Sequence, residues 1–240
     1  SAEGSIESLG TFAMMAMPKT SYLVYANDAV IPVGPCEALG GDVSVEIPAG
    51  MTYYDDLLTH GVQNDRRQIS PIITVRPWKS PYPPHRTWTL RVPIPIGYEP
   101  EQLVLCRLNG ENASALPTRL VERKIEGKPG RWLESDVRVW GNFVVKADTS
   151  APWVKPINFK SGNKFNGNVL TLKMSDNLSG VREYRCFING EWVLCEFDGK
   201  SATLSINLKQ VDSEAKALDL RIFLADACGN SREQAFNIRR

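Results

Sequence analysis

The chain has 240 residues, which is enough for two domains that each bury an apolar core. Lys and Arg total 28 against 27 Asp and Glu, so the formal net charge is only +1. No block of basic residues stands out that would neutralise phosphates, so we expect no nucleic-acid partner. No apolar run approaches the roughly 20 residues that cross a bilayer as a helix, so we expect no transmembrane segment.

Residues 1–40 are predicted to form a strand segment set apart from two main domains. The chain begins at Ser1 rather than Met, and we interpret it as a processed or truncated piece of a longer protein. The stretch SLGTFAMMA in this segment resembles VWGNFVVKAD at 139–148. The similarity marks the segment either as the tail of a preceding domain of the same kind or as a coincidence.

Residues 41–148 have the pattern of a β-sandwich, with turn residues separating segments that alternate between apolar and polar. In WTLRVPIPI, the apolar residues at 88, 90, 92, 94 and 96 fall on one face, and the prolines at 93 and 95 favour an edge strand. A turn or two of helix is expected at 54–58. Further strands are expected at 43–47, 72–76, 103–108, 132–135 and 137–145.

Residues 149–240 are predicted to form a second sandwich, because a stretch rich in Ser, Pro, Gly and Asn follows GNFVVKAD. Asn189-Gly190 is a strong hairpin signal. A two-residue turn there places Ile188 opposite Glu191, Cys186 opposite Val193, and Tyr184 opposite Cys195. Apolar alternation at 170–174, 204–208 and 218–224 predicts further strands. The fold class is therefore all-β, with two consecutive β-sandwich domains.

The five cysteines are Cys36, Cys106, Cys186, Cys195 and Cys228. Their number is odd, they show no CxxC spacing, and they are sparse for a disulfide scaffold. We interpret Cys186 and Cys195 as buried, unbridged side chains.

No catalytic constellation is evident. His60 and His85 are the only histidines, and neither lies in a zinc-binding HxH, HxxxD or HExxH arrangement. No GxSxG elbow occurs. Asp176 in SDNLSG and Asp226 in ADACGN could supply oxygen ligands to Ca²⁺, but Asp before Gly also stabilises turns, and we favour the turn role. We therefore predict no catalytic residue, no metal ligand, no cofactor and no enzymatic activity for this chain.

Two sets of aromatic side chains are candidates for ligand contact. Trp78, Tyr82 and His85 lie in RPWKSPYPPHRTW, where prolines keep a loop rigid and lower the entropy cost of binding. Phe187 and Trp192 face each other across the predicted hairpin, where such a pair also stabilises the strands by itself.

Several segments resemble known families. VSVEIPAGMTYYDD, WTLRVPIPI and RWLESDVRVWGNFVVKAD resemble the strand order of a ZU5-like sandwich, with Met51 where Ala is usual. DTSAPWVKPINF, SDNLSGVREYRCFINGEWVLCEFDGK and LADACGN continue the likeness. Together they resemble the C-terminal region of Bacteroidetes M23-type (lysostaphin-like) cell-wall peptidases, in which an immunoglobulin-like sandwich comes second. The match covers residues 42–240.

The resemblance implies an exported protein of the periplasm or cell surface. It implies a non-catalytic accessory module that positions a partner domain or contacts peptidoglycan, envelope glycan or an envelope protein. The zinc-binding HxxxD and HxH motifs of the family have no counterpart in this sequence. The alternative is that the chain is the C-terminal fragment of a zinc murein endopeptidase whose catalytic domain lies outside it.

Overall fold

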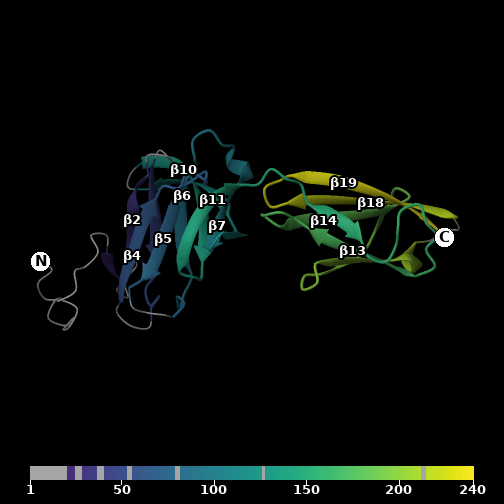
Figure 1. Cartoon of the computed structure of the whole chain (residues 1–240), viewed down its shortest axis with the longest axis horizontal. Helices are drawn as coiled ribbons and strands as arrows, with labels where there is room; N and C mark the ends of the chain where they lie inside the picture. The colour runs from purple at the N-terminus through teal and green to yellow at the C-terminus, as the bar shows by residue number, and fades with distance from the viewer. Residues whose placement is uncertain are drawn as a thin grey trace, which may run out of the picture.

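The computed structural model describes residues 21–24, 29–36, 41–52, 56–78, 82–125, 128–211 and 215–240. These residues form antiparallel strands and two short 3-10 turns, with no α-helix among them, which confirms the all-β prediction. Figure 1 shows two β-sandwiches, one after the other along the long axis of the molecule. In the described part of the chain, no helix is long and apolar enough to span a membrane.

The first sandwich consists of a six-stranded and a five-stranded sheet. The six-stranded sheet has the order β1 (Ser21–Val24), β4 (Asp56–Gln63), β5 (Ile72–Pro77), β11 (Gly141–Ala147), β7 (Leu103–Asn109) and β8 (Asn112–Ala115). The five-stranded sheet has the order β2 (Ala29–Cys36), β3 (Gly41–Ile47), β6 (Trp88–Pro93), β10 (Lys128–Val137) and β9 (Arg119–Ile125). Residues 1–20 lie outside the described part, whereas β1 and β2, from the segment predicted to stand apart, belong to these sheets.

Alternate residues of both sheets point inward and form one core. Trp88 is fully buried at its centre. Its ring stacks on Trp140 at 5.8 Å and meets Phe143 edge-on at 5.5 Å between centroids. The apolar face predicted for WTLRV thus lies in the core, with Trp88, Leu90 and Val92 all fully buried.

Two local predictions for the first sandwich are wrong. Residues 56–58, expected to be helical, begin β4, in which Asp56, Leu58 and His60 are buried with the period of a strand; residues 53–55 lie outside the described part. Strand β6 is central, because it pairs with both β3 and β10. Pro93 ends the strand instead of protecting an edge, and Ile96, expected in the core, is 74% exposed.

The second sandwich packs two four-stranded sheets around a separate core. One sheet has the order β12 (Trp153–Pro156), β13 (Val169–Ser175), β17 (Thr203–Asn207) and β16 (Cys195–Asp198). The other has the order β15 (Glu191–Val193), β14 (Val181–Ile188), β18 (Ala217–Asp226) and β19 (Ser231–Arg239). The apolar faces predicted on β13, β17 and β18 are all buried, which confirms them.

The hairpin at Asn189-Gly190 is confirmed. Both turn residues have positive φ, 53° and 88°, as a type I′ turn requires. Ile188 pairs with Glu191, and Cys186 with Val193, as expected. The predicted pairing of Tyr184 with Cys195 is wrong, because the chain leaves this sheet after Val193.

Beyond the hairpin the chain crosses to the opposite sheet. Cys195 begins β16 and pairs with Ile206, while Tyr184 pairs with Leu224. Cys195 therefore belongs to the sheet opposite that of Cys186 instead of to the same sheet. Both are free thiols in the core of the second sandwich, and a hydrogen bond joins them. This bond lowers the pKa of Cys195 and raises that of Cys186.

Candidate functional site

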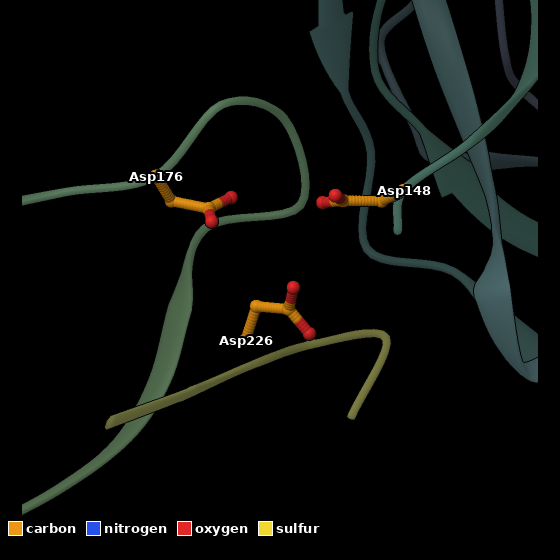
Figure 2. A group of neighbouring side chains, drawn as sticks. All are labelled: Asp148, Asp176 and Asp226. Atoms are coloured by element: carbon orange, nitrogen blue, oxygen red, sulfur yellow. The ribbon is translucent and has the colours of Figure 1, made fainter. Parts of the chain in front are cut away.

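Three aspartates meet where the two sandwiches join. Asp148 follows β11, Asp176 follows β13, and Asp226 ends β18. One carboxylate oxygen from each lies within 4.8 Å of those of the other two. Figure 2 shows the three carboxylates pointing toward a common space. Among the described residues this is the one group of three or more His, Cys, Asp or Glu side chains placed to share a metal ion.

Asp176 organises the turn that precedes β14. Its Oδ2 accepts hydrogen bonds from the backbone N–H of Leu178 at 3.0 Å and of Gly180 at 2.7 Å. Gly180 has φ of 84°, a value that favours glycine. The other oxygen, Oδ1, is buried and has no hydrogen-bond partner. The turn therefore uses only one of the two carboxylate oxygens.

Asp226 plays a similar part in the turn between β18 and β19. Its Oδ1 accepts the backbone N–H groups of Cys228 and Asn230, both at 2.9 Å. The Asn230 amide donates to Asp226 Oδ2 at 2.8 Å and to the backbone oxygen of Asp148 at 2.9 Å. The turn roles predicted for Asp176 and Asp226 are thus confirmed, and Asn230 ties the turn of Asp226 to Asp148 at the end of the first sandwich.

Asp148 connects the two sandwiches. Its backbone N–H donates to Gln102 in the first sandwich at 2.8 Å. Its Oδ2 accepts the N–H of Ser179 in the second sandwich at 2.8 Å, and its Oδ1 accepts that of Ser150 at 3.2 Å. Asp148 is a site residue that was not predicted from the sequence. No local pattern marks it, because it joins the others only through tertiary contacts.

The site concentrates negative charge in a buried place. Asp148 is 0% and Asp226 2% exposed. Burial raises the pKa of the Asp226 carboxyl, and repulsion from Asp148 and Asp176 adds to this rise, while hydrogen bonds from Asn230 oppose it. Within the described residues, the Lys and Arg ion pairs all involve other carboxylates. The hydrogen bonds described above for the three carboxylates come from backbone N–H groups and the Asn230 amide, which carry no net charge.

An apolar cluster surrounds the base of the site. Val104, Cys106 and Val144 on the outer face of the six-stranded sheet are buried against Leu178 and Cys228 of the second sandwich. Burial raises the pKa of Cys106 to about 11, and burial is also the main cause of the raised pKa of Cys228. Both thiols are therefore protonated packing groups near pH 7 rather than nucleophiles.

A groove of about 1040 Å³ runs beside the junction and is lined by both sandwiches. Arg119 and Leu133 contribute from the first, and Arg182 and Asp226 from the second. Asp226 thus contributes both to the groove and to the aspartate trio.

The predicted ligand-contact residues do not meet at this junction. Trp78, Tyr82 and His85 belong to the first sandwich and are exposed, Trp78 at 37% and Tyr82 at 56%. The loop between them, at 79–81, lies outside the described part. The backbone oxygen of Tyr82 accepts a hydrogen bond from Trp140 Nε1 at 3.1 Å, so one end of the loop is tied to the first sandwich.

Phe187 and Trp192 are on the second sandwich and pair directly across the hairpin, as expected. Trp192 is 60% exposed, and the neighbouring Leu194 and Phe197 are also exposed. The ring of Phe197 packs at 5.8 Å from Tyr184. The edge of the second sandwich formed by β15 and β16 thus presents several apolar side chains to solvent.

The side chain of Cys36 lies outside the described part. Of the two histidines, His60 is buried in β4, and His85 is exposed with its backbone N–H donated to Met51 at 2.7 Å. A comparison with protein-family models and a search of curated proteins both find no match to this chain.

Proposed function

We propose that this chain is a non-catalytic accessory module of a bacterial cell-envelope protein, in which two sandwiches are held at a fixed junction to position a partner domain. The observation that carries the proposal is the junction itself. Asp148 is hydrogen-bonded to Gln102, Ser179 and Asn230, so its contacts span both sandwiches. An apolar cluster with side chains from both sandwiches lies beneath these bonds. A flexible linker would need neither feature.

The envelope location, at the periplasm or cell surface, rests on the resemblance of residues 42–240 to the region that follows the catalytic domain of M23-type peptidases. The exposed aromatic residues Trp78, Tyr82, His85 and Trp192, with the half-buried Phe187, are the surface we propose for contact with peptidoglycan, envelope glycan or protein. Aromatic rings joined to polar tips suit such ligands because they bury a large area at low entropy cost.

The alternative is that these residues are the C-terminal part of a zinc M23-type murein endopeptidase. Under both hypotheses, neither of the two sandwiches catalyses a reaction. The sequence upstream of Ser1 in the gene distinguishes them, because HxxxD and HxH motifs there would establish the peptidase.

Fixed positioning is tested by spin labels placed on exposed sites of the two sandwiches, one at Glu111 and one at Lys209. We expect a single narrow distance distribution from the wild type. Leu178→Asp places a charge in the apolar cluster of the junction and should broaden the distribution, while the exposed control Asn177→Asp should not. A broad distribution for the wild type would rule out a fixed junction.

The non-catalytic assignment is tested by incubating the chain with purified peptidoglycan and Zn²⁺. We expect no release of soluble fragments, and measurable turnover would refute the assignment. Contact is tested by sedimentation with peptidoglycan, comparing wild type with Trp78→Ala and Trp192→Ala. Equal retention of all three would exclude both aromatic surfaces.

A further inference from the structure

The three carboxylates at the junction have the spacing of ligands around a single ion. Ca²⁺ binds oxygen at about 2.3–2.6 Å, so two of its ligands can lie up to roughly 5 Å apart. One carboxylate oxygen from each of Asp148, Asp176 and Asp226 lies within 4.8 Å of those of the other two. They can therefore contact one ion together without rearrangement of the backbone.

A buried oxygen in the site is left without a partner. Asp176 Oδ1 has no hydrogen-bond partner and is buried, although Oδ2 of the same side chain accepts two backbone N–H groups. A buried acceptor without a donor destabilises the folded state, and more so when the group is charged. In Figure 2 the Asp176 carboxylate points toward those of Asp148 and Asp226. An ion between them would satisfy the unpaired oxygen.

The turn hydrogen bonds do not explain why three negatively charged carboxylates are gathered in one place. Neutral N–H donors stabilise each carboxylate singly, but they do not remove the repulsion among three carboxylates gathered in one place. Asp148 and Asp226 are almost completely buried, and an isolated buried charge is costly unless it is paired or binds a metal. Asparagine would make similar turn bonds without that cost.

From these observations we infer that Asp148, Asp176 and Asp226 bind one divalent cation of the calcium class at the junction of the sandwiches. All three ligands are oxygens, which Ca²⁺ prefers, whereas Zn²⁺ favours nitrogen and sulfur ligands. Water would complete the six to eight ligands of Ca²⁺. Since the first sandwich ends at Asp148 and the second supplies the other two ligands, the ion would join the two sandwiches. The inference goes beyond the accessory role and does not depend on it.

Isothermal titration calorimetry with CaCl₂, after dialysis of the chain against EDTA, tests the inference. We expect one Ca²⁺ per chain with a Kd on the order of 0.1–1 mM, as in extracellular calcium modules. Asp176→Asn keeps an oxygen for the turn but removes the charge, and should weaken binding at least tenfold. The matched control is Asp198→Asn, because Asp198 likewise caps a turn, through Lys200 and Ser201, but is exposed and does not belong to the trio. Its affinity should equal that of the wild type.

A measurement on the wild type alone covers the case in which Asp176→Asn does not fold. In ¹H–¹⁵N spectra, added CaCl₂ should shift the amides of Leu178, Ser179 and Cys228 along one saturable curve, and EDTA should reverse the shifts. The inference is overturned if no binding is detected up to 10 mM CaCl₂, if both Asn variants bind as well as the wild type, or if the spectral changes avoid these three amides.

Discussion

The charged cluster on the five-stranded sheet leads to a quantitative prediction about stability. Glu134 on β10 is 0% exposed and accepts hydrogen bonds from Arg91 on β6 and Arg119 on β9. Arg91 also pairs with Glu46, and Arg119 with Asp136. Glu134 therefore holds together three neighbouring strands through two guanidinium groups.

Glu134→Gln should destabilise the first sandwich by about 3 kcal/mol, the lower end of the range for breaking a buried ion pair. The lower end is expected because Arg91 keeps Glu46 and Arg119 keeps Asp136. The control is Glu122→Gln, since Glu122 is 82% exposed and lies 3.9 Å from Arg131. This change should alter stability by no more than about 0.5 kcal/mol.

Urea unfolding followed by tryptophan fluorescence measures both variants, because Trp88 and Trp132 are buried in the first sandwich and report on it. Burial raises the pKa of the Glu134 carboxyl, but hydrogen bonds from Arg91 and Arg119 lower it by more, so its pKa lies below the ordinary value of 4.5. The ionised Glu134 carboxylate thus contributes its full stabilisation to the folded state above pH 4.5. This contribution is lost as the pH falls through the lowered pKa of the folded state.

The difference in the free energy of unfolding between wild type and Glu134→Gln should accordingly be constant near neutral pH and shrink below about pH 4. A loss smaller than about 1 kcal/mol at pH 7, or one equal to that of Glu122→Gln, would show that the buried pair adds no net stability.

Three further outcomes are expected. Gly190→Ala should destabilise the second sandwich by about 1 kcal/mol, because Gly190 has φ of 88°, while Gly199→Ala, which meets only an ordinary contact, should be neutral in the same thermal unfolding experiment. Leu220→Ala should cost about 2–5 kcal/mol in urea unfolding, since Leu220 is fully buried, and a smaller loss would show that the core closes over the cavity. At pH 8, iodoacetamide should modify Cys195 faster than Cys106, because a hydrogen bond lowers the pKa of the first and burial raises that of the second to about 11; the reverse order by mass spectrometry would contradict these directions.

Predictions from the sequence agree best with the structure where a short local motif sets the backbone conformation. Asn189-Gly190 predicted the hairpin and its first pairs, because a type I′ turn fixes the register of the strands beside it. The pairing failed at Cys195, where the chain crosses to the other sheet. A two-residue turn sets only the nearest pairs, and the packing of the core decides where the strand leaves the sheet.

Two other predictions were wrong because strands distant in the sequence pair with the segments concerned. Prolines in WTLRVPIPI suggested an edge strand, yet Pro93 stands at the end of β6, where it pairs only with β10, so the strand can be central. The segment before Leu58 suggested a helical turn, but two flanking strands pair with β4 and hold it extended. Backbone hydrogen bonds between distant segments outweigh weak local propensities.

The residue pattern was enough to predict an all-β chain with alternating apolar faces and glycine turns, and to identify Asp176 and Asp226 as turn residues. It also carried an unused signal, because VLC on β7 and FVV on β11 are apolar on both faces, as expected for a covered sheet. That the second sandwich covers this face, and that Asp148 meets the other two carboxylates, depends on contacts between distant segments. The reason is physical: the turn bonds of each aspartate are local, whereas the charge that the three share depends on segments 28 or more residues apart meeting at one junction.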